Sequence, residues 1–289
     1  MLLLSPERRS IRYTRPGLYA LNYGFYVLLT VGILAFVYYF YFYRTTFLLD
    51  VPFLLKGAVV TIVISILSMF FATIFGFLGA LGRLSRLTPV RWLALVYVEV
   101  IRGTPILVQL LLWGFGVSQA LSTLGFDPYN IAFSVMTALQ NNSLLPDPQT
   151  FDAAFYGILG LSFNYGAYLT EVFRTGIESV DRGQSEAAMS LGLSPRQIMR
   201  HVILPQAFRI TIPPFTNYFI TLVQDTALLS VVGSVIEIQQ TTTALASPLS
   251  SAPFRQLFVY VLGAFLFLLI CYPLALLSRY LERRMSVAY

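Results

Sequence analysis

Residues Gly57–Gly82 read GAVVTIVISILSMFFATIFGFLGALG, without a single Asp, Glu, Lys or Arg. A helix needs about 20 such residues to cross a hydrocarbon core of ~30 Å. Inside a bilayer the backbone must satisfy its own hydrogen bonds, and a helix does so within one segment. This stretch therefore predicts a transmembrane helix.

The composition of the whole chain agrees with a membrane protein. Of its 289 residues, 57% are hydrophobic and only 11% are charged. Soluble domains carry about 25% charged residues, so this chain cannot cover a globular surface with charge. The composition argues against a soluble enzyme, and it also argues against a disordered chain.

Other long apolar runs lie on both sides of Gly57–Gly82. Four contain no charged residue and a fifth is interrupted only by Asp225: Pro16–Tyr43, Gly103–Phe126, Ala153–Thr170, Gln256–Ser278 and Ile210–Ile236. The first is too long for a cleaved signal peptide and lacks a small-residue cleavage site after it. We therefore predict an all-α integral membrane fold with about six transmembrane helices.

The basic residues predict the orientation. Fifteen of the 19 Lys and Arg residues fall on one side of this arrangement, and only Arg44, Lys56 and Arg255 fall on the other, with Arg102 at a boundary. Loops rich in Lys and Arg stay in the cytoplasm. We predict that both termini are cytoplasmic and that residues 121–152 form an external segment.

The sequence lacks the parts of several kinds of active site. The one lysine, Lys56, follows Leu55, so no Walker A loop can form, because that loop requires Gly before its Lys. His201 is the only histidine and Cys271 the only cysteine. Histidine- and cysteine-based zinc sites need more of these side chains. A Ser–His hydrolase could use only His201, which lies in a predicted cytoplasmic loop, and the sequence has no GxSxG nucleophile elbow. We predict no catalytic residue, no metal site and no cofactor in this chain.

Residues 179–212 form the longest polar loop between two spans. We expect a short helix over Gln184–Leu191, with Asp181 as its cap. Gly192 is suited to stop it, because glycine readily adopts the left-handed conformation at a helix C-terminus. Ser194, Pro195 and Gln197 have the spacing of a capping box for a second helix. We expect Pro205 to end that second helix.

Three interpretations of this loop compete. It could be an amphipathic helix pair lying on lipid headgroups, with its arginines toward anionic lipid. It has the spacing of a DNA-binding helix-turn-helix, but it is confined between two spans and its exposed basic face is small. The third interpretation is a docking element for a cytoplasmic partner.

Charged and polar residues within spans are costly and usually functional. Glu99 and Arg102 are three residues apart and can pair on one helix face, and Thr104–Pro105 marks a helix start or kink. Asp225 lies deepest and is the candidate for a broken helix beside a water-filled path. The candidate lining or gating residues are Glu99, Arg102, Gln109, Glu171, Asn217, Gln224, Asp225 and Thr226. For Glu171, a place at the cytoplasmic end of its helix is an equal alternative.

The loop resembles a known motif. EAAMSLG followed by VILP resembles the EAA loop of ATP-binding-cassette (ABC) importer permeases, with Val202 in place of the usual Ile. The matching residues are Glu186, Ala187, Ala188, Gly192, Leu204 and Pro205. YVEVIRGTPILVQL, GAYLTEVFRTGIESVDRGQSEAA and DTALLSVVG narrow the resemblance to the polar amino acid uptake family. It covers most of Gly57–Arg284, and residues 121–152 are longer than usual.

The resemblance implies a five-helix permease domain over residues 51–289, preceded by an additional helix within residues 1–50. It implies a bacterial inner-membrane protein that imports amino acids. Its implied partners are cytoplasmic ATPase subunits that hold ATP and magnesium, a second permease copy or homologue, and an extracytoplasmic amino-acid-binding protein; nucleic acid is not among them. Residues 179–212 would dock on the ATPase.

A second position also departs from the family. Gln224 stands where a lysine is usual before Asp225, so the family's preference for substrate charge does not carry over. The sequence leaves two rival functions. One is a stand-alone channel or secondary transporter for small polar solutes, and the other is a membrane enzyme.

Overall fold

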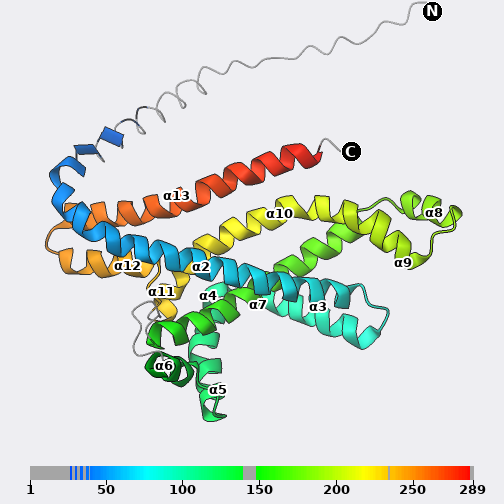
Figure 1. Cartoon of the computed structure of the whole chain (residues 1–289), viewed down its shortest axis with the longest axis horizontal. Coiled ribbons are helices and arrows are strands. Elements are labelled where there is room, and N and C mark those ends of the chain that lie inside the picture. Colours follow the sequence, from blue (N-terminus) through cyan, green and yellow to red (C-terminus); the bar gives the residue numbers. More distant parts are fainter. Residues whose placement is uncertain are drawn as a thin grey trace, which may run out of the picture. The chain divides into compact units, whose positions relative to one another are not determined.

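The computed structural model describes residues 40–138, 148–233 and 235–286, together with a few positions between 27 and 38. The chain divides into two units, Met1–Leu49 and Asp50–Tyr289. The first predicted span, Pro16–Tyr43, lies mostly outside the described residues. Over the described ranges the regular elements are all helical, as the sequence predicts (Figure 1).

The helices follow one another with short connections. In chain order they are α2 Arg44–Arg83, α3 Thr88–Arg102, α4 Ile106–Leu111, the π-helix η1 Leu112–Val117, α5 Ser118–Thr123, α6 Pro128–Ala138, α7 Pro148–Glu178, α8 Arg182–Ser190, α9 Pro195–Ile198, the π-helix η2 Met199–Ile203, α10 Leu204–Asp225, the 3₁₀ turn η3 Thr226–Leu228, α11 Leu229–Val232, α12 Ile238–Ala246, the 3₁₀ turn η4 Ser247–Leu249 and α13 Pro253–Ser286.

Three segments of the described chain are both long and apolar enough to cross a membrane: Leu48–Arg83, Ile106–Thr123 and Pro253–Met285. They coincide with three of the predicted spans. The predicted fourth and fifth spans form α7 and most of α10, which are long helices of more polar composition. Their polar side chains include Asn164 and Asp225, which line a cavity described below. A helix that lines a cavity needs less apolar surface than one surrounded by lipid.

Helix α7 lies at the centre of the second unit and contacts α3, α4, α6 and α10. Two glycines of α2 lie close against it. A Cβ atom built on Gly79 would lie 2.1 Å from Thr170 Oγ1, and one built on Gly76 would lie 2.6 Å from Leu169 Cβ. Small residues at helix contacts in membranes let two backbones approach in this way.

One break between helices lies where the sequence predicts it, and a second lies at a residue that the sequence analysis did not single out. Gly103–Pro105 separates α3 from α4, so the predicted break at Thr104–Pro105 is confirmed. A second break precedes α12, where the fully buried Glu237 caps the helix by accepting hydrogen bonds from the backbone N–H groups of Gln239 and Gln240, both at 2.6 Å.

The prediction that Pro205 ends the helix after Ser194 is wrong. The chain stays helical from Pro195 through η2 into α10, and Pro205 lies in the first turn of α10. The π-helix before it replaces the regular i→i−4 hydrogen bonds, with Leu204 N–H bonded to the Met199 carbonyl. The change of register lets the helix continue through a residue that has no N–H.

Candidate functional site

A cavity of about 450 Å³ opens beside the break between α3 and α4. Its walls come from α7, α10 and the break itself, and the lining residues are Arg102, Gly103, Thr104, Pro105, Ile106, Asn164, Tyr165, Tyr168, Tyr218, Thr221 and Asp225. A volume of this size accommodates a small organic molecule. The lining combines one cation, one carboxylate, three phenols and the polar backbone of a helix start.

Arg102 is the cation of this cavity. Its guanidinium carbon lies 5.3 Å from the ring centroid of Tyr168, which is a cation–π contact. The salt bridges of the described residues do not include the predicted Glu99–Arg102 pair, and Glu99 is exposed. Arg102 therefore presents its charge at the cavity without a carboxylate partner among the described residues.

Asp225 is the carboxylate of the cavity and ends α10. The Tyr165 hydroxyl donates a hydrogen bond of 2.6 Å to Asp225 Oδ2. No Lys, Arg or His nitrogen of the described residues lies within 4.0 Å of this carboxylate. Asp225 is thus held by a neutral donor and keeps its capacity to bind a cation.

Three tyrosines form an aromatic group between these two charges. The ring centroids of Tyr168 and Tyr218 are 5.4 Å apart, and Tyr165 lies 6.3 Å from Tyr168 and 6.4 Å from Tyr218. Tyrosine faces attract cations, and their hydroxyls hydrogen-bond polar groups. This wall suits a ligand that is both charged and partly apolar.

Gln109 stabilises the break between α3 and α4 by side-chain hydrogen bonds. Its amide nitrogen donates to the Ile101 carbonyl at 2.7 Å and to Thr104 Oγ1 at 2.7 Å. Its amide oxygen accepts a 3.1 Å hydrogen bond from Asn164 of α7. Gln109 and Asn164 are both buried, so this connection fixes the break that carries Arg102 against α7.

The eight predicted lining or gating residues lie in different parts of the structure. Only Arg102 and Asp225 line the cavity. Glu99 and Gln224 are exposed, Gln109 is buried behind the break, and Thr226 is buried with its hydroxyl on the Val223 carbonyl. Asn217 is bonded to α13, where Ser278 Oγ donates to its side-chain oxygen at 2.9 Å.

Several lining residues were missed by the sequence analysis, namely Asn164, Tyr165, Tyr168, Tyr218 and Thr221. Helical spacing carries a signal for some of them. Tyr218, Thr221 and Asp225 are three and four residues apart, which places them on one face of α10. Tyr165 and Tyr168 have the same relation on α7.

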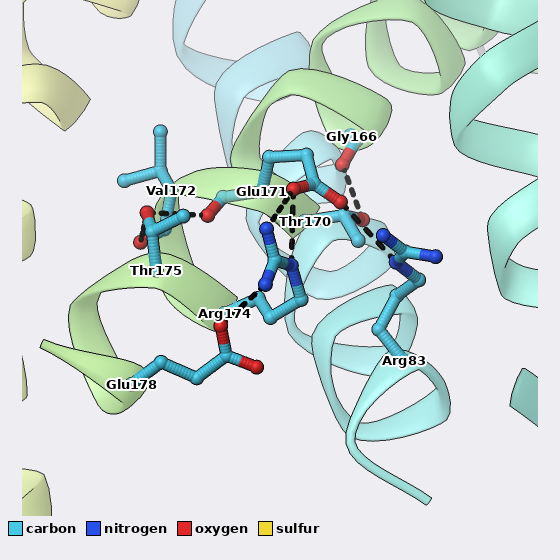
Figure 2. A network of polar contacts seen from close by, with 8 residues as sticks. All are labelled: Arg83, Gly166, Thr170, Glu171, Val172, Arg174, Thr175 and Glu178. Carbon is cyan, nitrogen blue, oxygen red and sulfur yellow. Dashed lines mark hydrogen bonds and ion pairs between the residues drawn. The ribbon is translucent and has the colours of Figure 1, made fainter.

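Glu171 lies outside the cavity, at the centre of an ion-pair network (Figure 2). Its carboxylate accepts hydrogen bonds from Arg174 Nε at 3.0 Å and from Arg174 Nη2 at 2.6 Å. On its other side it lies 3.3 Å from Nε of Arg83, the last residue of α2. Arg174 also pairs with Glu178, one turn further along α7.

The loop after α7 folds as its capping signals predict. Asp181 caps α8 by accepting a 2.6 Å hydrogen bond from the Gly183 N–H. Gly192 has φ +81°, in the left-handed region, and the next N–H, from Leu193, donates to the Ala188 carbonyl at 3.2 Å, which closes the helix end. Ser194 and Gln197 form the predicted capping box. Helix α8 begins at Arg182, two residues earlier than predicted.

The loop presents an apolar surface of its own. Ala188 is buried, while Ala187 and Glu186 are exposed. Met189 and Leu191 are 56% and 81% exposed, and Leu204 and Phe208 at the start of α10 are also exposed. Gln206 donates a 2.9 Å hydrogen bond to Gln184 and so ties α8 to α10. Exposed apolar side chains on a firmly capped element are typical of an interaction surface.

Comparisons with known proteins agree with these observations. Residues 72–287 match the family described as binding-protein-dependent transport system inner membrane component. The chain is similar to the L-cystine transport system permease protein TcyB of Bacillus subtilis (strain 168), with 36% identity over 81% of this chain and 87% of the relative. It is 32% identical to the glutamine transport system permease protein GlnP of Escherichia coli (strain K12), over 82% of this chain and 94% of that protein.

Solved structures give the same result. A crystal structure of an amino acid ABC transporter with histidines matches with a TM-score of 0.65 and 30% identity, over 83% of this chain and 97% of that chain. An inward-facing structure of the MetNI methionine ABC transporter matches with a TM-score of 0.55, over 80% of this chain and 97% of that chain. At 19% identity, the second likeness shows the fold alone.

Proposed function

The chain belongs to the family of binding-protein-dependent transport system inner membrane components, and on that premise we propose that it carries an amino acid through the membrane by way of the cavity at Arg102 and Asp225. It is a permease subunit of an ABC importer, which works with an ATPase. Our proposal concerns the amino acid substrate, its route through the protein and the partners other than the ATPase.

One observation carries the choice of substrate. The cavity contains a guanidinium and a carboxylate that have no ion-pair partner among the described residues. A zwitterionic amino acid offers the complementary pair of charges, its carboxylate for Arg102 and its ammonium for Asp225. The backbone at the start of α4 adds N–H groups that favour a carboxylate. The tyrosines leave room for side chains of several kinds, which supports a broad rather than a single specificity.

The loop around α8 supports a site for the ATPase. Its caps fix the geometry of α8, and Ala187 leaves a low surface that a partner can approach closely. The exposed apolar side chains Met189 and Leu191 would be covered in such a complex. We propose the EAA residues Glu186–Gly192, with Leu204 and Pro205, as the coupling element. A second permease copy or homologue and an extracytoplasmic binding protein complete the proposed importer.

The proposed function is tested by uptake into vesicles. The purified chain is reconstituted with its ATPase and binding protein, and labelled amino acids are supplied outside. We expect uptake that needs ATP, the ATPase and the binding protein together. Uptake that persists without the ATPase would instead support the stand-alone transporter or channel, and a complex that hydrolyses ATP but accumulates no amino acid would reject the substrate class.

The orientation gives a separate prediction. In a Cys271→Ser background, a cysteine placed at Phe126 should react with a membrane-impermeant maleimide from outside, and one placed at Arg196 only from the cytoplasmic side. The reason is the excess of Lys and Arg in the loops assigned to the cytoplasm. The opposite labelling pattern would reverse the assignment of both termini to the cytoplasm.

A further inference from the structure

The ion-pair network of Arg83, Glu171, Arg174 and Glu178 has no part in the cavity or the coupling element described above. Three of its side chains are well protected from solvent: Arg83 is 18%, Glu171 17% and Arg174 22% exposed, whereas Glu178 is 50% exposed. Ion pairs on an exposed surface contribute little to stability. The three shielded side chains of this network therefore differ from an ordinary surface ion pair.

The network has two different kinds of contact. Within α7, Arg174 holds Glu171 by two hydrogen bonds and also pairs with Glu178. Between α7 and α2, Arg83 Nε and Glu171 Oε1 are 3.3 Å apart, yet neither atom makes a hydrogen bond. The tie between the two helices therefore depends on opposite charge rather than on a directed hydrogen bond.

The position of Glu171 along α7 connects the two sites. Tyr168, which contacts Arg102 in the cavity, lies one turn before Glu171 on the same helix. In the other direction, α7 ends at Glu178 and α8 begins at Arg182. Next to Glu171, Thr170 meets Gly79 of α2 without room for a Cβ atom. The charge contact thus lies beside a close contact of α2 and α7.

We infer that Glu171 is a positioning residue that transmits motion between the coupling element and the cavity. Arg174 holds the Glu171 carboxylate in place by two hydrogen bonds, and the contact of that carboxylate with Arg83 makes α2 and the last turns of α7 move together. A displacement of α8 then moves the cavity wall at Tyr165 and Tyr168 instead of bending α7. This role rests on the proposed function, but Glu171 itself does not bind the substrate.

The test uses the complete complex with matched variants. Glu171→Gln and Arg83→Gln remove the charge contact between the helices, whereas Arg83→Lys keeps it, because a lysine ammonium serves as a point charge. Glu178→Gln removes the other carboxylate of the network and leaves the α2–α7 contact intact. We expect amino acid imported per ATP hydrolysed to fall about fivefold or more in the first two variants, a coupling effect of ordinary size. Arg83→Lys and Glu178→Gln should stay close to the native ratio, and the KM for uptake should not change.

A second measurement does not depend on the substrate. Hydrogen exchange is followed in the complex with and without a non-hydrolysable ATP analogue. In the native complex we expect the analogue to change exchange both in α8 and in the α7 peptide that contains Tyr165 and Tyr168. In Glu171→Gln and Arg83→Gln the change should be confined to α8.

The outcomes separate the two proposals. If the native complex imports no amino acid but the exchange pattern is as expected, the substrate assignment fails and the role of Glu171 stands. If the change in hydrogen exchange still extends to the peptide with Tyr165 and Tyr168 in Glu171→Gln, the role of Glu171 is overturned. Equal losses in Glu171→Gln and Glu178→Gln would also overturn it, because they would mean that helix stiffness alone matters. An Arg83→Lys variant as defective as Arg83→Gln would overturn the role of Glu171 as well.

Discussion

Replacing Gly192 by Val is expected to lower binding-protein-stimulated ATP hydrolysis about tenfold or more while the protein still inserts and folds. Gly192 has φ +81°, and an L-residue in this region costs roughly 1–2 kcal/mol, which corresponds to about a factor of 10. The strain falls on the turn between α8 and α9. Relief of that strain would move Ala187 and Leu191 away from the position that the ATPase requires.

Two control variants test whether the loss comes from backbone strain and whether that strain must lie at Gly192. No atom lies within 4 Å of a Cβ built on Gly192, so a side chain there meets no steric clash. Gly192→Asn should retain most of the stimulation, because asparagine tolerates the left-handed region. Gly125 has φ +86° in the turn before α6, far along the chain from the loop, and Gly125→Val should retain coupling. Full stimulation in Gly192→Val would reject the docking role of this turn.

The coupling element could be predicted from sequence because its signals are local. Asp181, Gly192, Ser194 and Gln197 each act on backbone groups within three or four residues, so their roles do not depend on the rest of the fold. The spans were predictable for a related reason, since the bilayer demands long apolar helices. Pro205 was misassigned because the π-helix before it shifts the helical register, and no local signal announced that change.

The cavity could be predicted only in part. Arg102 and Asp225 were found because charges within spans are rare, whereas the tyrosines of α7 and α10 were hidden among the many aromatic residues of an apolar chain. Which of these face one another depends on how α7, α10 and the break at Gly103–Pro105 pack. Glu99 illustrates the limit: its spacing from Arg102 permits a pair, but packing places the guanidinium over Tyr168 instead.

The largest loss of transport is expected from Asp225→Asn. The variant keeps the side-chain shape and an oxygen that can accept the hydrogen bond of Tyr165, so folding should be little affected. It removes the only acidic group among the described residues that line the cavity. A hydrogen bond to a charged group is worth about 1.5–3 kcal/mol, so ATP-dependent uptake per assembled complex should fall roughly 10- to 100-fold. Thermal stability is recorded for the same samples.

Two further variants and the stability measurement decide what Asp225 does. Tyr165→Phe removes the hydroxyl but leaves the carboxylate, and it should reduce uptake less than Asp225→Asn does. Glu282→Gln is an equivalent change outside the cavity, next to Asn217, and uptake should remain near the native value. If Asp225 instead had a structural ion partner, stability would fall with transport by about 3–5 kcal/mol, because a buried charge would be left unpaired. Normal uptake by Asp225→Asn would leave the ammonium group of the substrate without its proposed partner, and the amino acid would then have to pass by another route.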